Sequence, residues 1–189
     1  LDSLFTTEPN EIFKVDNKVP DLEELIRKNG GRREPIGENI TELCRIADVV
    51  FIALHGAMGE NGQLQATLDN YGIRYTGSGY VGSLLAMDKD LAKRLLRDAG
   101  VRTPDWEFVD PTLSESRTTI LEKIGLPCVI KPTSCGSSVG VTIVEDEGEL
   151  DAALAAAAPW GDRVLAEKKI NGRELTVGIL DGQTLPIVE

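Results

Sequence analysis

Hydrophobic and polar positions follow two different periods along this chain of 189 residues. A continuous apolar run, ADVVFIALHG (residues 47–56), predicts a buried parallel strand, because a strand covered on both faces does not alternate. Helical patterns lie around it: DLEELIRKNGG (21–31), ITELCRIA (40–47) and a helix that opens at about Gly62. The segment IRYTGSGY (73–80) then favours a short strand and a turn.

A clean amphipathic helix is predicted for MDKDLAKRLLRDAG, residues 87–100. Asp88 can cap its start and Gly100 ends it. Its apolar positions share one face: Leu91, Ala92, Leu95, Leu96 and Ala99. Lys89 falls in the first turn, where a cation opposes the helix dipole. Two explanations stay open for Lys89: it is solvated, or it reaches toward a negative group.

Strand patterns dominate the second half of the chain. They are LPCVIKP (126–132), GVTIVE (140–145), RVLAEKKI (163–170), RELTVGIL (173–180) and QTLPIVE (183–189), with one helix, GELDAALAAAAPW (148–160), among them. Asp181 and Gly182 suit a type I′ turn, so the last two strands are expected to form a hairpin. The sequence therefore predicts an α/β region up to about Met87, followed by an α+β region.

Composition argues against several classes of partner. The formal net charge is −11 and the pI is near 4.6, which disfavours nucleic acid and anionic membrane surfaces. No segment approaches the 18 or so apolar residues of a membrane span. Three cysteines, Cys44, Cys128 and Cys135, match no metal or disulfide spacing and favour a reduced, cytoplasmic setting. An anion bound by this acidic chain therefore needs locally placed lysines.

The stretch VIKPTSCGSSVGVTIVE (129–145) carries the first candidate chemistry. A loop of small residues lies between two predicted strands, and Lys131 lies on the first of them. Backbone N–H groups of such a loop can face phosphate oxygens, the hydroxyls of Ser137 and Ser138 can donate, and the lysine supplies a point charge. Strands on both sides, with the lysine before the loop, exclude a Walker A loop. A flexible exposed loop is the alternative.

Three further residues are candidates by their position. Glu167 and Glu174 lie at the end of one predicted strand and the start of the next, where a carboxylate can accept from ribose hydroxyls. Solvated surface glutamates are the alternative. His55, the only histidine, ends the apolar run, and strand ends are where α/β proteins bind ligands. A core histidine is the alternative there.

The order of five motifs resembles the D-alanine–D-alanine ligases of the ATP-grasp superfamily. The motifs are LHGAMGENGQLQATLDNYGIRYTGSG, MDK, VIKPTSCGSSVGV, VLAEKKINGRELTVGIL and LPIVE, and the resemblance covers residues 50–189. It implies a partial Rossmann-like, pre-ATP-grasp domain with a parallel sheet (1–86). The ATP-grasp central lobe (87–166) and the first strands of the C-terminal lobe (167–189) would follow.

The resemblance also implies an activity. The enzyme would use ATP, with Mg²⁺ or Mn²⁺, to phosphorylate the carboxylate of one D-alanine. The amine of a second D-alanine would then attack the acyl phosphate, giving D-alanyl-D-alanine, ADP and phosphate. Formation of an acyl phosphate depends mainly on the positioning of the reactants and on charge neutralisation, and the residue types present suit both. The resemblance implies that the enzyme works in the cytoplasm, in peptidoglycan synthesis for cell-wall biogenesis and cell shape. The complete protein would be a homodimer.

Roles of individual residues follow from the same resemblance. The ATP-contacting positions are Lys89, Lys131, Gly136, Ser137, Ser138, Glu167, Lys168, Ile170 and Glu174. Among these, Glu167, Lys168 and Ile170 correspond to the adenine-binding hinge, and Glu174 to the ribose-binding carboxylate. His55 and Ser137 correspond to catalytic and substrate-binding residues near the first D-alanine.

Some positions depart from the family pattern. Asn61 replaces an aspartate in the usual GEDG, and Lys169 stands where a bulky apolar residue is common. The family's N-terminal substrate-binding segment is not found, and its metal ligands are expected beyond Glu189. The sequence is therefore interpreted as an incomplete ligase that would not make dipeptide alone. Three alternatives stay open: a D-alanine–D-lactate or D-alanine–D-serine ligase, a non-catalytic nucleotide-binding remnant, and another ATP-grasp carboxylate–amine ligase.

Overall fold

A computed structural model describes residues 21–37 and 39–189. The chain divides into two compact units, Leu1–Leu43 and Cys44–Glu189. Helix α2 (Leu22–Lys28) lies in the first unit, and helix α3 (Ile40–Ile46) begins there and crosses the division. Asp21 caps α2, because its carboxylate accepts from the N–H groups of Glu23 and Glu24. Both predicted helices are confirmed.

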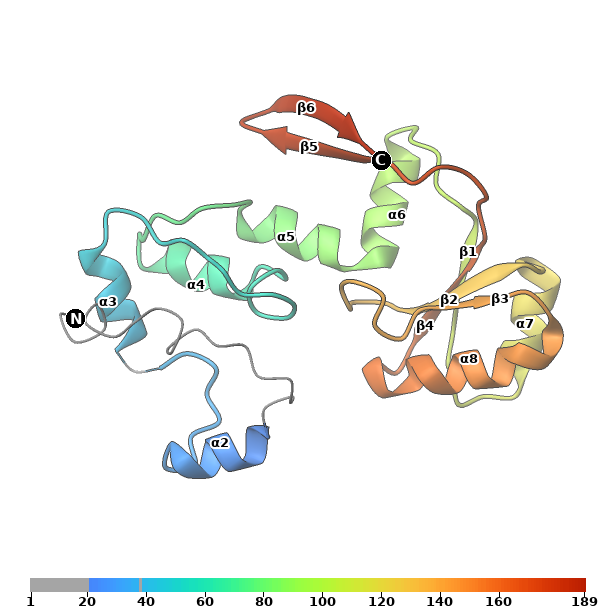
Figure 1. Cartoon of the computed structure of the whole chain (residues 1–189), viewed down its shortest axis with the longest axis horizontal. Coiled ribbons are helices and arrows are strands. Elements are labelled where there is room, and N and C mark those ends of the chain that lie inside the picture. Colours follow the sequence, from blue (N-terminus) through green and yellow to red (C-terminus); the bar gives the residue numbers. More distant parts are fainter. Residues whose placement is uncertain (1–20, 38) are drawn as a thin grey trace. The chain divides into compact units, whose positions relative to one another are not determined.

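Three helices follow in the second unit: α4 (Gln63–Asn70), α5 (Tyr80–Met87) and α6 (Lys89–Asp98) (Figure 1). The predicted opening of α4 at Gly62 is confirmed, since Gly62 is its N-cap residue. The carboxylate of Asp88 caps α6 as predicted, accepting from two backbone N–H groups of the first turn. The leucines of the predicted apolar face are exposed, and the buried side chain of α6 is that of Lys93.

The predicted buried strand at residues 47–56 is wrong. Within the described part of the chain, this run makes a single parallel bridge, between Val50 and Tyr75, and Phe51 is 77% exposed. An apolar run becomes a buried strand only when neighbouring strands and helices cover both faces. The described residues supply one pairing segment on one side.

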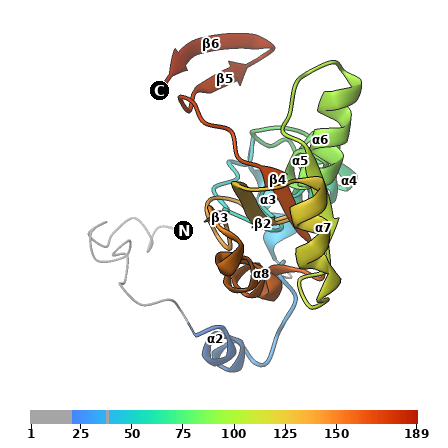
Figure 2. The same cartoon turned by 90° about the vertical axis from the view of Figure 1, so that its right-hand side faces the viewer.

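The second unit contains a four-stranded antiparallel sheet. Its strands are β1 (Trp106–Val109), β2 (Cys128–Pro132), β3 (Thr142–Val144) and β4 (Val164–Lys168), in the order β1-β4-β2-β3. Helices α7 (Glu115–Lys123) and α8 (Leu150–Ala157) lie beside it, with short 3₁₀ turns η2 (Glu147–Glu149) and η3 (Ala158–Trp160) around α8 (Figure 2).

The two faces of this sheet differ in chemistry. Side chains alternate along a strand, so Cys128 and Ile130 of β2 point to one face and Lys131 to the other. The first face meets α7 and α8 in one core cluster, where Ile120, Ile130 and Leu150 are fully buried. The second face carries Lys131 and, from β4, Glu167. The sheet thus separates an apolar core from a charged site.

A two-stranded hairpin ends the described chain. Strands β5 (Thr176–Leu180) and β6 (Gln183–Val188) pair antiparallel. Asp181 and Gly182 both have positive φ, 49° and 73°, as a type I′ turn requires. The predicted hairpin is confirmed. In the described residues, no helix has the length and apolar character to cross a bilayer.

Candidate functional site

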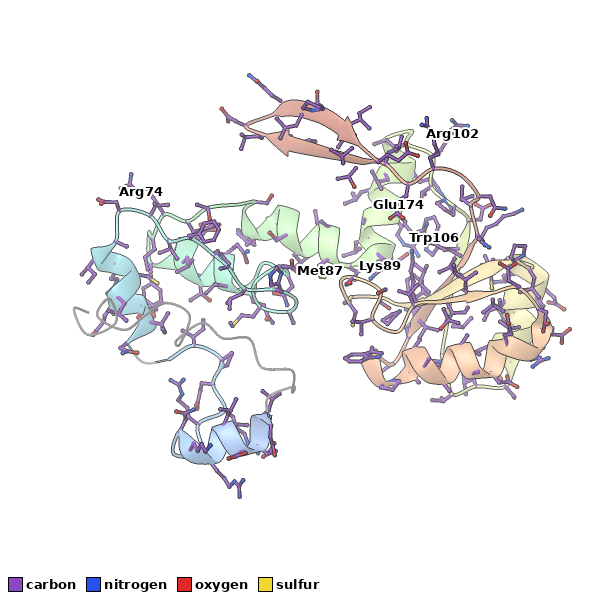
Figure 3. All side chains as sticks on the ribbon, in the orientation of Figure 1. Arg74, Met87, Lys89, Arg102, Trp106 and Glu174 are labelled. Carbon is purple, nitrogen blue, oxygen red and sulfur yellow. The ribbon has the colours of Figure 1, made fainter. Side chains whose placement is uncertain are left out.

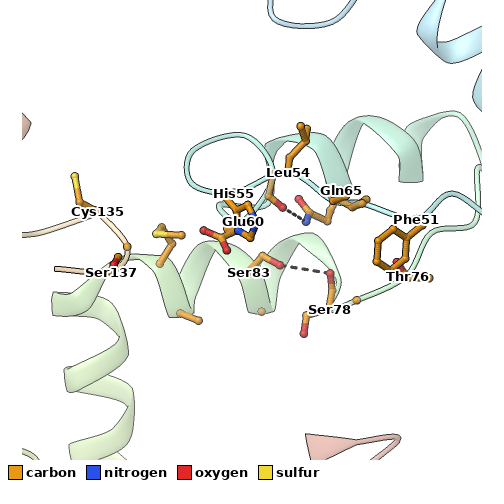
Figure 4. Close-up of a pocket in the computed structure, with 18 of the residues that line it drawn as sticks. Phe51, Leu54, His55, Glu60, Gln65, Thr76, Ser78, Ser83, Cys135 and Ser137 are labelled. Carbon is orange, nitrogen blue, oxygen red and sulfur yellow. Dashed lines mark hydrogen bonds between the residues drawn. The ribbon is translucent and has the colours of Figure 1, made fainter. Parts of the chain in front are cut away.

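A cavity of about 850 Å³ lies between the loop after Val50, helix α5 and the loop that joins β2 to β3 (Figure 4). Residues 133–140 of that joining loop form a segment that we call the lid. Four of the predicted site residues line the cavity: His55, Lys89, Gly136 and Ser137. Residues more than 80 positions apart in the sequence therefore meet in one place.

Hydrogen bonds fix the loop that carries His55. The carboxylate of Glu60 accepts from the N–H of Gly56 at 2.7 Å, and the Gln65 side chain donates to the carbonyl of Gly59 at 2.7 Å. Gly62 has φ +88°, and a Cβ there would collide with the carbonyl oxygen of Tyr80. Only glycine allows this close approach of the loop to α5. The His55 imidazole is held at the cavity by a folded loop, not by a strand.

Lys89 connects α6 to the lid. Its backbone N–H donates to the Thr133 carbonyl at 3.1 Å, and its Nζ donates to the carbonyl of Cys135 at 2.6 Å. The lysine in the first turn of α6 therefore reaches toward negative partial charges, which decides between the two explanations left open by the sequence.

The lid itself presents unused donors. In the described segments, the backbone N–H groups of Gly136, Ser137 and Ser138 donate no hydrogen bond. Ser137 has φ +55°, a conformation that is uncommon outside glycine. Small residues leave these N–H groups open, so the lid can bind an anion through its backbone.

A second cavity, of about 290 Å³, adjoins the first. Its lining includes Lys89, Lys93, Lys131 and Glu167. Lys89 and Ala86 line both cavities. One cavity thus contains the predicted D-alanine residues His55 and Ser137, and the other contains Lys131 and Glu167, with Lys89 between them.

Glu167 is the centre of a buried ion cluster. Lys131 donates to its Oε1, and Lys93 donates to its Oε2 at 2.8 Å. Burial alone raises the pKa of this carboxyl, but the hydrogen bonds and charges of the two lysines outweigh burial and lower the pKa overall. Glu167 is therefore ionised in the folded protein. The same surroundings act on Lys89, where burial and the charge of Lys131 lower the pKa of the ammonium.

The remaining predicted residues lie outside both cavities. Lys168 is the last residue of β4 and Ile170 lies two positions later, both with exposed side chains. The N–H of Lys168 donates to the Asp105 carbonyl at 3.0 Å. Glu174, labelled in Figure 3, is exposed and precedes β5. Ser138 lies in the lid beside the first cavity but does not line it. Their predicted contacts with nucleotide stay predictions.

Sequence reasoning missed two residues of the site, Lys93 and Glu60. Lys93 follows Lys89 by four positions, so the two share a face of α6, and that spacing was the available signal. Glu60 lies within the motif LHGAMGENGQLQATLDNYGIRYTGSG, and its carboxylate orders the loop of His55, a contact that the motif alone does not indicate.

The described carboxylates do not fit a divalent metal. No group of three or more metal-ligating side chains lies together in residues 21–37 and 39–189. The two glutamates at the cavities are already engaged, Glu60 with a backbone N–H and Glu167 with two lysines. Magnesium needs free carboxylate oxygens, and neighbouring ammonium groups repel it.

Comparison with known proteins gives consistent relatives. The family models "D-ala D-ala ligase N-terminus" and "D-ala D-ala ligase C-terminus" match residues 4–78 and 95–189. A D-alanine–D-alanine ligase A of Bacillus cereus is 44% identical over 154 residues, covering 79% of this chain and 50% of the relative. One from Pediococcus pentosaceus is 38% identical over 171 residues, covering 89% and 47%.

Solved structures agree with these relatives. The crystal structure of D-alanine–D-alanine ligase from Bacillus anthracis has a TM-score of 0.73 and 41% identity, covering 82% of this chain and 50% of that one. The ligase from the same organism complexed with ATP has a TM-score of 0.70 and 40% identity, covering 79% and 50%. The chain spans about half the length of the curated relatives it matches.

Proposed function

The chain belongs to the D-alanine–D-alanine ligase family, and from this premise we propose that its protein joins two D-alanines with ATP. The observation that carries the proposal is the pair of cavities that share Lys89. A ligase of this kind must hold a carboxylate and a nucleotide polyphosphate side by side. One cationic side chain between two cavities meets that need, because it can interact with both anions.

ATP supplies the phosphoryl group that activates the D-alanine carboxylate. In the proposal, Lys131 and Lys89 neutralise its phosphates, and the free N–H groups of the lid donate to phosphate oxygens. Glu167, Lys168 and Ile170 provide the adenine hinge, and Glu174 accepts from the ribose. Lys168 and Ile170 would act mainly through their backbone groups, and the carboxylate of Glu167 is engaged by two lysines.

The first cavity is the proposed D-alanine site. His55 and Ser137 line it, and in the proposal both would orient the substrate carboxylate. Closing the lid over the cavity would exclude water, which protects the acyl phosphate from hydrolysis. These residues position the reactants and stabilise charge, which is the main protein contribution to phosphoryl transfer.

Several finer statements belong to the same proposal. A parallel, Rossmann-like sheet would belong to the N-terminal domain of the whole protein, and the lobe boundaries would lie at residues 86/87 and 166/167. The whole protein would work in the cytoplasm, in peptidoglycan synthesis and maintenance of cell shape, as a homodimer that uses Mg²⁺ or Mn²⁺. A D-lactate or D-serine ligase, or a non-catalytic remnant, is less favoured because the matched relatives are named D-alanine–D-alanine ligases.

The test uses the whole protein that contains this chain. It is incubated with ATP and with D-alanine alone, or with D-lactate or D-serine as the competing second substrate. We expect ADP and D-alanyl-D-alanine in equal amounts, measured by a coupled assay and by mass spectrometry. Omission of D-alanine should abolish ADP release. A depsipeptide formed with D-lactate, or D-alanyl-D-serine, as the main product would identify the corresponding alternative ligase. ADP formation without any condensed product would reject ligation.

A further inference from the structure

Lys93 is a buried lysine beside the second cavity, and the proposed reaction gives it no role. It lies one helical turn after Lys89 on α6 and is 7% exposed. Burying an ammonium group is unfavourable unless the group is paired and hydrogen-bonded. Its burial between a helix and a sheet therefore needs a cause.

Three groups surround the Lys93 ammonium. It donates to Glu167 Oε2 at 2.8 Å and to Thr103 Oγ1 at 2.7 Å. The ring of Trp106, labelled in Figure 3, lies with its centroid 4.8 Å from the Lys93 Nζ. Trp106 is fixed in turn, since its Nε1 donates to Asp90 at 3.1 Å. The ammonium has little freedom to move.

Glu167 is shared between two cations, one on each oxygen. Lys131 occupies Oε1 and Lys93 occupies Oε2. Two ammonium groups and one carboxylate leave a single net positive charge in this cluster. Without Lys93, Glu167 and Lys131 would form a neutral pair, and the charge that Lys131 offers to a ligand would be cancelled.

We propose that Lys93 is a positioning residue of the ATP site, which engages one oxygen of Glu167 so that Lys131 stays in place and its charge remains available to a polyphosphate. The proposal rests on the proposed function, because the polyphosphate is that of ATP. Lys93 itself need not contact the nucleotide. It acts through Glu167, which lies 74 positions away in the sequence.

The first experiment replaces Lys93 in the whole protein. Lys93→Met keeps the aliphatic stem beneath Trp106 and removes the charge. We expect the KM for ATP to rise about tenfold while kcat stays within about twofold, since ground-state binding is what weakens. Lys93→Gln can still donate to Glu167 but has no charge, so it should raise the KM for ATP to a similar extent. It replaces the Met variant in the experiment if that variant does not fold.

Two controls separate this role from a general effect of charge or stability. Lys123→Met removes a lysine from an exposed pair with Glu107 and should leave both kinetic constants unchanged. The double variant K93M/E167Q returns the cluster to one positive charge. We expect it to recover most of the ATP KM that Lys93→Met loses, which a purely structural role does not explain.

The outcomes are distinguishable. If the unmodified protein forms no dipeptide and no ADP, the proposed function fails, and the role of Lys93 fails with it. If the unmodified protein is active and both Lys93 variants lower only the melting temperature, with the KM for ATP unchanged, the role of Lys93 alone is overturned. A double variant with a KM no lower than that of Lys93→Met would also overturn it.

Discussion

Strand β2 has only five residues, yet its two faces lie in different surroundings. Ile130 points into the core formed with α7 and α8 and is fully buried. Lys131, the next residue, points to the opposite face and binds Glu167. Strand alternation alone produces this division, because successive side chains leave the sheet on opposite sides. Stability and the proposed ligand binding are therefore assigned to adjacent positions of one strand.

A second difference lies between the core and the charged face in how they are stabilised. The core is stabilised by the burial of apolar surface, and a cavity in it lowers the stability of the fold. The charged face depends on complete pairing, since each of Lys93, Lys131 and Glu167 is costly when its partner is removed. Substitutions on the two faces should therefore change different measured quantities.

The largest expected loss of stability is on the core face. Ile130→Ala leaves a cavity among Ile120, Leu150 and their neighbours. We expect the free energy of unfolding to fall by about 2–5 kcal/mol, measured by urea denaturation. The KM for ATP should stay the same at temperatures where the variant is folded. A large change in this KM would show that the two faces are not separable.

The matched change on the charged face is Lys131→Met. We expect the KM for ATP to rise at least about tenfold, since a charge-assisted contact to phosphate is lost. Glu167 keeps Lys93 as a partner, so the free energy of unfolding should change less than in Ile130→Ala. Unchanged ATP kinetics would remove Lys131 from the site.

Low pH should reduce the contribution of the charged face to the free energy of unfolding. The pKa of Glu167 is lower in the folded protein than in the unfolded chain, so the unfolded chain binds more protons between the two values. Stability from this carboxylate is present above its unfolded pKa and is lost as pH falls through the folded value. Denaturation curves below pH 5 should therefore show a smaller pH dependence for Glu167→Gln than for the unmodified protein. Equal slopes would contradict the ion cluster.

The smallest expected effects concern two glycines of the lid. Gly140 has φ +65°, and a Cβ there would lie 2.8 Å from Pro132 Cγ. We expect Gly140→Ala to cost about 1–3 kcal/mol of stability. At Gly136 the nearest atom to a Cβ is Glu60 Oε2 at 3.7 Å, an ordinary contact, so Gly136→Ala serves as the control. Equal losses would show that the lid has another conformation in solution.

Local patterns predicted the elements whose causes are local. The Asp181-Gly182 turn, the cap by Asp88 and the two strands beside the lid all follow from neighbouring residues. Helix α7 was missed because ESRTTILEK lacks a clear apolar stripe, helix α5 because nothing marked its start, and strand β1 because it has only four residues. The prediction for residues 47–56 was wrong because an apolar run does not show whether neighbouring strands are present to pair with it.

The site was predictable in part for the same reason. Lys89, Lys131 and Glu167 were found through motifs, and the structure brings all three to the second cavity. The ion pair of Lys93 with Glu167 was not predicted, since Glu167 is distant in the sequence and a lysine on an amphipathic helix normally faces solvent. Pairing between distant charges depends on tertiary structure, which periodicity does not describe.

Alkylation of the cysteines tests most directly whether the lid covers the nucleotide and substrate site. Cys135 lines the first cavity, whereas Cys44 lies on α3 and does not line it. Burial raises the pKa of the Cys128 thiol and slows its reaction. The whole protein is treated with iodoacetamide, with and without ATP and D-alanine, and each cysteine is followed by mass spectrometry. We expect the ligands to slow modification of Cys135 several-fold and to leave Cys44 unchanged. An unchanged rate at Cys135 in an active enzyme would contradict the placement of the site.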